Sequence, residues 1–374
     1  MTSNVTSNRT ANRTANVTNV SPAGSAAADP AEPTDSPLLA WPGGAAGDGV
    51  DAGVALHYGD PIAEQRAFVT AAGWVDRSNR GVVAVPGADR LSWLHNITSQ
   101  HLSGLPDGAG AEALVLSPHG HVEHHLLVAE TAGVTWLDTE PDRVPELLAY
   151  LTSMRFMLRV DPADATADLA VLTVVGPATP AVLAGFGAPV PARPHGVTPL
   201  PGGGFARRMP WPGTDAADLL VPRSRLVEIA QRLTAAGARP AGSWAFEAAR
   251  VEARRPRLGW ETDHRTIPHE VGWIGVAVHL DKGCYRGQET VARVQNLGRP
   301  PRRLVLLHLS GESEQLPARG TSVTLAGRPV GFVGTAVRHH ELGQVALAMV
   351  KRTVPDDAVL EVAGIPAAID SGES

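Results

Sequence analysis

Apolar positions recur along this chain at two different spacings, and each spacing predicts a type of element. The string "ADRLSWLHNITSQHL" (88–102) places Leu91, Leu94 and Ile97 on one helical face. The string "RLVEIAQRLTAAG" (225–237) repeats this helical spacing and ends in a glycine, which is typical of a helix stop. Residues 112–130 instead predict a β-hairpin around a Ser-Pro-His-Gly turn, and residues 169–176 predict a buried strand.

The order of these patterns predicts how the chain is divided. Residues 1–48 repeat Asn every four positions and then become rich in Ala, Pro and Ser, so we expect a disordered, low-complexity tail. Strands and helices then alternate over 49–298, which favours a mostly antiparallel α+β region. Within it, residues 187–213 hold seven prolines and predict a long surface connection. Residues 299–374 contain short strands between glycine-rich turns, which predict a small β-barrel or sandwich.

Composition narrows the class of protein. A 374-residue chain with 43% hydrophobic and 19% charged residues is globular and long enough for more than one domain. The net charge of −6 disfavours nucleic-acid binding, and the apolar runs are too short to span a bilayer. A single cysteine fits a reducing compartment, and the N-terminus has no hydrophobic signal core. We therefore expect a cytoplasmic, monomeric protein with no membrane or nucleic-acid partner.

The one cysteine lies in "DKGCYRGQE" (281–289), between two glycines and two cations. Lys282 and Arg286 are near Cys284 in sequence, and nearby cations favour the reactive thiolate. Local chemistry alone leaves two readings, an ordinary surface cysteine in a basic loop or a working thiol. A protease-like nucleophile fits poorly, because no His-Asp partner can be assigned.

The complete string "KGCYRGQE" is more informative about function than the charges next to the cysteine. It resembles the K-G-C-Y-x-G-Q-E signature of the YgfZ-type folate-binding proteins, which are relatives of the glycine-cleavage T-protein, an aminomethyltransferase. The strings before it (250–273), near the N-terminus (75–98) and in the C-terminal region (331–352) also look like this family. The resemblance covers roughly residues 50–370.

This resemblance implies an aminomethyltransferase-like fold of two α+β lobes and a C-terminal β-barrel around a cavity for tetrahydrofolate or a one-carbon derivative. It implies a role in the assembly or repair of iron–sulfur enzymes, which would be partners together with the assembly proteins. Cys284 would be the active thiol, Tyr285 and Gln288 would shape its surroundings, and Lys282 and Arg286 would support it electrostatically.

A second candidate site is the strand "HGHVEHHLLV" (119–128). His121, Glu123 and His125 share one face of this strand, a spacing that could ligate zinc. No fourth ligand is evident, so we expect no metal. In the family register, His125 takes the position of the T-protein's pterin-binding aspartate, and Glu123 on the same face is the alternative pterin ligand.

Charged residues around the signature complete the expected folate site. Arg250 belongs to a set of arginines that could bind the folate carboxylates, because guanidinium pairs with carboxylate bidentately. The resemblance places Glu252 and Glu270 near the cavity, where they could bind the pterin amine face.

Two alternatives to the iron–sulfur role stay open. One is a folate-dependent aminomethyl or methyl transferase, although T-proteins carry an F-I-G type string where this chain has "CYRG". The other is a folate-binding scaffold without chemistry.

Overall fold

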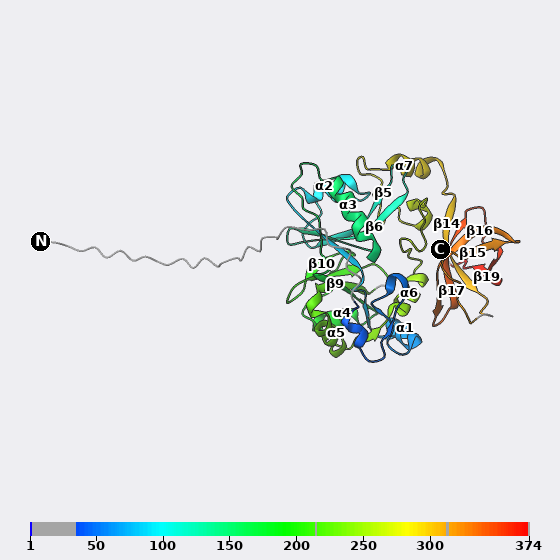
Figure 1. Cartoon of the computed structure of the whole chain (residues 1–374), viewed down its shortest axis with the longest axis horizontal. Coiled ribbons are helices and arrows are strands. Elements are labelled where there is room, and N and C mark those ends of the chain that lie inside the picture. The colour runs from blue at the N-terminus through cyan, green and yellow to red at the C-terminus, as the bar shows by residue number, and fades with distance from the viewer. Residues whose placement is uncertain (2–34, 214, 312–313, 373–374) are drawn as a thin grey trace. The chain divides into compact units, whose positions relative to one another are not determined.

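A computed structural model describes Met1 and residues 35–213, 215–311 and 314–372 (Figure 1). Regular structure begins within the segment expected to be disordered. Ser36 caps the short helix η1 (Pro37–Ala40), and Leu38 is fully buried in the core of the first sheet. Strand β1 (Ala45–Ala46) pairs with β2 (Ala55–His57). The tail predicted over 1–48 is therefore too long at its C-terminal end, and residues 2–34 lie outside the described residues.

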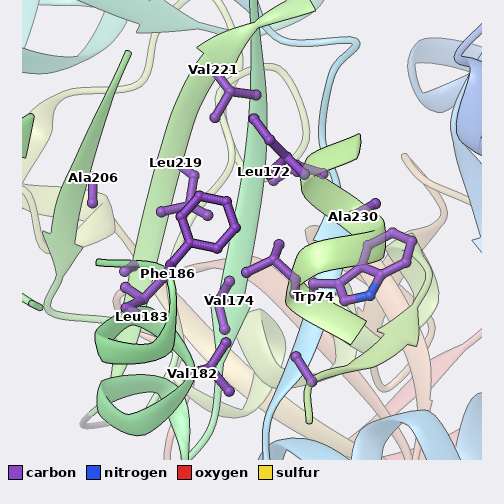
Figure 2. Close-up of a cluster of buried hydrophobic side chains, with 14 of the residues drawn as sticks. Trp74, Leu172, Val174, Val182, Leu183, Phe186, Ala206, Leu219, Val221 and Ala230 are labelled. Carbon is purple, nitrogen blue, oxygen red and sulfur yellow. The ribbon is translucent and has the colours of Figure 1, made fainter. Parts of the chain in front are cut away.

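The first lobe is built on a six-stranded sheet in the order β10-β11-β12-β9-β3-β13, antiparallel except for the parallel β13–β3 pair. Its strands are β3 (Gly73–Asp76), β9 (Leu169–Val175), β10 (Val197–Pro199), β11 (Phe205–Met209), β12 (Ala216–Pro222) and β13 (Arg239–Ala241). The helices α4 (Thr179–Gly185) and α5 (Leu226–Ala235) cover one face of this sheet. Figure 2 shows Leu183 from α4 and Ala230 from α5 packed against sheet residues such as Leu219.

The second lobe is built on a five-stranded sheet in the order β5-β6-β7-β4-β8. Its strands are β4 (Gly81–Pro86), β5 (Ala109–Leu116), β6 (Val122–Thr131), β7 (Val134–Thr139) and β8 (Ala163–Asp164). The helices α2 (Arg90–Ile97) and α3 (Val144–Ser153) bury Leu94 and Leu147 against this sheet. The predicted hairpin is β5–β6, and the two predicted helices are α2 and α5.

The two sheets pack on each other through their uncovered faces. Val82 and Ala129 from the second sheet meet Val171, Phe205 and Leu220 from the first in one buried cluster. The remaining helices are α1 (Pro61–Thr70), α6 (Ser243–Glu252), α7 (Gln288–Leu297), η2 (Gly49–Asp51), η3 (Pro141–Arg143), η4 (Arg223–Arg225) and η5 (Pro268–Val271).

The C-terminal region is a closed barrel in the order β14-β17-β16-β15-β18-β19 (Figure 1). Its strands are β14 (Arg302–Leu309), β15 (Ser322–Leu325), β16 (Arg328–His339), β17 (Gly343–Lys351), β18 (Val359–Val362) and β19 (Ile365–Ile369). Ala248 and Val251 of α6 pack against barrel residues including Leu347, which joins the barrel to the lobes. The expected fold class, two α+β lobes with a C-terminal barrel, is confirmed.

The expected surface connection over 187–213 is wrong in part. This segment contributes β10 and β11 to the first sheet, and Arg207 on β11 is fully buried. Its guanidinium lies 2.6 Å from a carboxylate oxygen of Asp138 on β7 and 2.8 Å from one of Asp218 on β12. A charged residue can occupy the space between the sheets here because two carboxylates pair with it.

Candidate functional site

The cysteine lies in a loop, residues 281–287, that we call the thiol loop. Two of its side chains are buried, and the residues between them are exposed. Lys282 and Tyr285 are buried, whereas Gly283 and Cys284 are exposed. Tyr285 packs in a cluster with Trp273 and other apolar residues. The exposed thiol therefore lies between two buried side chains, Lys282 and Tyr285, which we call the anchors of the loop.

The first anchor, Lys282, does not serve the thiol as expected. Its ammonium donates hydrogen bonds to three carbonyls at the C-terminal end of α2, those of His95, Thr98 (2.6 Å) and Gln100 (3.2 Å). Such carbonyls have no partner within the helix and carry its negative dipole end, so a cation caps them well. Burial lowers the pKa of Lys282 to about 8.

The other expected cation, Arg286, is also engaged elsewhere. Its guanidinium lies 2.8 Å from a carboxylate oxygen of Glu123 on β6 and 5.6 Å from the ring centre of Tyr150 on α3. Gln288 donates only a long contact of 3.5 Å to the Lys282 carbonyl. Within the part of the chain that the structure describes, no hydrogen bond reaches the Cys284 thiol.

Close backbone packing fixes the end of the thiol loop. Gly287 has φ +82°, and a Cβ there would lie 2.6 Å from the Ser117 carbonyl oxygen and 2.8 Å from the Gly120 Cα. The β5–β6 turn thus packs directly on the start of α7, and only glycine fits. Gly283 differs, since a Cβ there would meet nothing within 4 Å.

The strand β6 connects the thiol loop to the interior. The pairing of β6 with β5 shifts at Glu123, because Leu116 pairs with Val122 whereas Val115 pairs with His124. This β-bulge places Val122 on the face of His125 and turns Glu123 away from that face. Glu123 holds Arg286, whereas the His125 ring lines an internal pocket. The predicted shared face of Glu123 and His125 is therefore wrong, because the bulge interrupts the alternation of the strand. Among the described residues, no group of three or more His, Cys, Asp or Glu could hold a metal ion.

We call this internal space the polar pocket. It has a volume of about 40 Å³ and lies between the β3–β4 turn, β6, one face of α6 and the segment after α6. Its lining residues are Asp51, Val54, Val75, Asp76, Arg77, Asn79, Arg80, His125, Leu127, Glu140, Trp211, Ser243, Phe246, Glu247, Arg250, Pro256 and Arg257. Four carboxylates and four guanidinium groups line it, so its charge is close to balanced.

Most of these charges are paired with one another. Arg250 is 2% exposed and binds Glu247 (2.6 Å), Glu261 (3.1 Å) and the Thr335 hydroxyl of the barrel (2.6 Å). Arg257 is paired in the same way with Glu140 and Asp51, at 2.7 and 2.8 Å. Arg250 therefore lines the polar pocket, but its guanidinium is already bound by side chains of the protein itself.

Three lining groups keep free bonding capacity. One Asp76 oxygen accepts from the Ser78 amide, and the other accepts no well-aligned hydrogen bond from the described residues, although Asp76 is 2% exposed. Burial raises the pKa of Asp76. The Trp211 indole N–H likewise has no acceptor in the described chain. Arg77 lies 4.2 Å from the ring centre of Phe246, with a 3.1 Å hydrogen bond to Thr173.

The His125 ring is fixed by a residue that the sequence did not reveal. Nε2 of His125 lies 2.9 Å from Glu112, and the ring stacks on Trp273 at 4.8 Å and 10°. Glu112 is fully buried and also binds Arg255 at 2.7 Å. Burial alone would raise the pKa of Glu112, but the His125 bond and the charges of His125 and Arg255 lower it to about 2. The ionised Glu112 side chain thus accepts a hydrogen bond from Nε2–H of His125, and Nδ1 is the ring nitrogen that remains available.

A wider, more open pocket of about 430 Å³ adjoins this cluster. It shares Trp211 with the polar pocket, and Arg255 and His195 also line it. His195 has a left-handed backbone (φ +57°), and burial lowers its pKa to about 4. Its Nε2 lies 3.7 Å from Glu112.

Two of the residues expected at the folate site lie elsewhere. Glu252 is about half exposed and lies 3.3 Å from His339 of β16. Glu270 in η5 binds Arg302 of β14 at 2.8 Å and accepts from the Ile267 amide. Both carboxylates contact the barrel and are absent from the lining of the polar pocket. Conversely, Asp76 and Glu112 were not predicted from the sequence as candidate site residues. Each is the single acidic residue of an otherwise apolar strand, and this pattern could have indicated both.

The fold and this arrangement together define a class of protein. The solved structure of glycine cleavage system aminomethyltransferase T from Bartonella henselae matches 89% of this chain and 95% of its own, with a TM-score of 0.79. The two chains are 20% identical, so this likeness concerns the fold. The fold is thus aminomethyltransferase-like.

The sequence comparison identifies the family. The model of the GCVT N-terminal domain matches residues 58–282, and the chain belongs to this family. An aminomethyltransferase of Synechococcus elongatus is 28% identical over 74% of this chain and 76% of its own. A chloroplastic protein of Arabidopsis thaliana named as a transferase is 27% identical over 69% of this chain, which spans 60% of that relative.

The family expected from the thiol-loop signature is therefore confirmed at the level of this domain. Membership of its YgfZ-type branch belongs to the proposal below. In the described part of the chain, every helix is too short or too polar to cross a membrane.

Proposed function

We propose that this protein is a YgfZ-type member of the family, binds tetrahydrofolate or a one-carbon derivative in the polar pocket, and supports assembly or repair of iron–sulfur enzymes through Cys284. One observation carries the proposal. The only cysteine is displayed between two buried anchors, and β6 links its loop to the wall of the polar pocket. A thiol presented in this way is available to a second molecule while its loop stays fixed.

The free groups of the polar pocket suit a pterin. A pterin is an uncharged ring with several N–H donors and ring acceptors. The unpaired oxygen of Asp76 would accept from it, the Trp211 N–H would donate to it, and His125 Nδ1 would face it from β6. The balanced charge of the lining disfavours a strongly anionic ligand in this pocket. The folate would carry the one-carbon unit.

The polar pocket is smaller than the pockets that usually bind ligands of the size of a folate. Pockets for ligands of this size are about 300–1,000 Å³, whereas the polar pocket has about 40 Å³. Binding therefore requires side chains to move. Trp211 is the side chain best placed to do so, because it separates the polar pocket from the neighbouring space of about 430 Å³.

Cys284 would act on a cargo delivered by a client enzyme. Thiolates are the usual ligands of iron–sulfur clusters, and an exposed thiol can hold a cluster or sulfur species for a short time. Lys282 would act as a structural anchor, because its ammonium is bonded to α2 carbonyls. Tyr285 would be the second anchor, and Arg286 with Glu123 would fix the loop to β6.

Aminomethyl transfer is the second candidate. It is favoured by the aminomethyltransferases that align with three quarters of this chain. In this case the His125–Glu112 pair would stand at the pterin position expected from the family. A scaffold that binds folate without using the thiol is the third.

Folate binding can be tested directly. We expect tetrahydrofolate to change the tryptophan fluorescence saturably, because Trp211 and Trp273 lie at or beside the polar pocket. Replacement Asp76→Asn should weaken binding about tenfold or more, since one buried acceptor is lost. Glu252→Gln is the matched control and should bind like the wild type. The absence of saturable binding would reject all three candidates, because each of them binds folate.

The role of the thiol needs a cellular test. In cells lacking the native copy, wild-type protein should restore the activity of iron–sulfur enzymes, and Cys284→Ser should not. Gly283→Ala is the control in the same loop, because its added methyl meets no neighbour. Equal restoration by Cys284→Ser would favour the scaffold. Formation of methylene-folate from an aminomethyl-loaded carrier protein would instead favour the transferase.

A further inference from the structure

The turn that follows α3, residues 155–159, exposes three successive apolar side chains. Phe156 is 80% exposed, Met157 98% and Leu158 40%. Single exposed apolar residues are common on protein surfaces, but a run of three is unusual without a function. The other large apolar residues exposed in the described chain are not grouped in this way.

Hydrogen bonds at both ends of this turn stabilise its exposed form. The Leu158 amide donates to the Arg155 carbonyl and closes the turn. Asp89 accepts from the Arg159 amide at 2.8 Å and from its guanidinium at 2.8 and 3.0 Å. Phe156 has φ +46°, a left-handed conformation that is unfavourable for a residue other than glycine. The exposed side chains are thus presented at some energetic cost.

The turn and the thiol loop flank the same helix. Asp89, which holds Arg159, immediately precedes α2, whereas Lys282 binds carbonyls at the C-terminal end of α2. Eight helical residues span about 12 Å. Leu280, next to the thiol loop, is also 39% exposed. A protein interface of ordinary size, about 800 Å² per partner, would cover both ends of α2.

We propose that the turn 155–159 is the docking surface for a partner protein that presents an uncharged apolar pocket, and that this partner is the one served at Cys284. The proposal rests on the proposed function for the identity of the partner as a client. Apolar centres ringed by polar groups are typical of protein interfaces.

The charges of the turn favour a protein over a lipid surface. The Arg155 and Arg159 side chains are 45% and 76% exposed and pair with Asp161 and Asp89. The patch therefore has no net charge with which to attract an anionic membrane. An uncharged apolar surface on a partner protein matches this patch.

The first experiment maps the contact in living cells. A photo-crosslinking p-benzoylphenylalanine is placed at Phe156, at Cys284 or, as a control, at Val359 of β18, which is 75% exposed. We expect the same protein to be captured from positions 156 and 284 and not from 359. Capture of different proteins at 156 and 284, or of nothing at 156, would overturn the proposal. This result does not depend on any iron–sulfur activity.

The second experiment separates docking from chemistry. Phe156→Ser with Met157→Ser should leave the free energy of unfolding unchanged, because both side chains are exposed. It should need about tenfold more protein than the wild type to restore iron–sulfur enzymes, with full activity at high expression. Cys284→Ser should fail at every expression level. Normal activity of the double variant at low expression would overturn the docking role, and failure of the wild type itself would overturn the proposed function.

Two further measurements exclude other occupants. Wild-type protein should not float with phosphatidylglycerol vesicles, and its sedimentation should match that of the double variant. Flotation that the double substitution abolishes would identify a membrane surface. A change of mass on substitution would identify an interface between copies of this chain. Either result would overturn the proposal.

Discussion

Strand β6 connects the polar pocket and the thiol loop, yet the two regions differ in whether their reactive polar groups are bonded within the protein. In the pocket, Arg250 and Arg257 are bound by carboxylates and hydroxyls of the protein itself. In the loop, the cations are also bound internally, but the Cys284 thiol is left to solvent. The internal pairs connect the walls of the pocket to one another, whereas the Cys284 thiol is exposed. Substitutions in the pocket should therefore affect stability first, and substitution of the thiol should affect function alone.

The largest expected effect is at Arg250. Replacement Arg250→Met leaves Glu261, which is fully buried, without its cationic partner, and should lower the free energy of unfolding by about 3–5 kcal/mol. Urea unfolding of the ligand-free protein measures this. Arg239→Met is the control at an exposed strand position and should change stability by less than about 0.5 kcal/mol. Equal losses in the two variants would show that the buried pairs do not stabilise the pocket.

The next effect concerns pH and Glu112. The pKa of Glu112 is about 2 in the folded protein, below its ordinary value of 4.5. The ionised Glu112 side chain therefore contributes fully to the free energy of unfolding above pH 4.5, and this contribution is lost as the pH falls toward 2. The shift corresponds to about 3 kcal/mol. Glu112→Gln should therefore be less stable at pH 7, and its disadvantage should shrink between pH 4.5 and 2. Glu341→Gln, at a 72% exposed position, should follow the wild type throughout. A pH-independent difference would contradict the assigned charge of Glu112.

The fold was predictable where burial follows a simple period. The apolar spacing of α5, the alternation in β6 and the short barrel strands each indicated their element correctly. Strand β11 was missed because its sequence, Phe-Ala-Arg-Arg-Met, breaks the apolar pattern. Arg207 within it is buried only because Asp138 and Asp218 arrive from two other strands. Such partners are set by tertiary packing and leave no local signal.

The same limit applies to the candidate site. The signature located the thiol loop, since a specific string of neighbours is a local property. It could not indicate that Lys282 turns inward, because the carbonyls that bind it come from α2, more than 180 residues earlier. Likewise, the role of His125 depends on Glu112 across the β5–β6 hairpin. The sequence thus indicated a candidate loop, whereas the contacts made by its side chains could not be predicted from it.

The smallest effect compares the two glycines that flank the thiol. Gly287→Ala forces a methyl group to within 2.6 Å of the Ser117 carbonyl at φ +82°, so it should lower the free energy of unfolding by about 1–3 kcal/mol. Gly283→Ala meets no neighbour and should change stability by less than about 1 kcal/mol in either direction. Thermal unfolding of both variants, with the rate of Cys284 alkylation, measures the difference. Faster or slower alkylation only in Gly287→Ala would show that the β5–β6 turn positions the thiol. Indistinguishable variants would mean that the loop is not held by this contact, and that the anchors Lys282 and Tyr285 suffice.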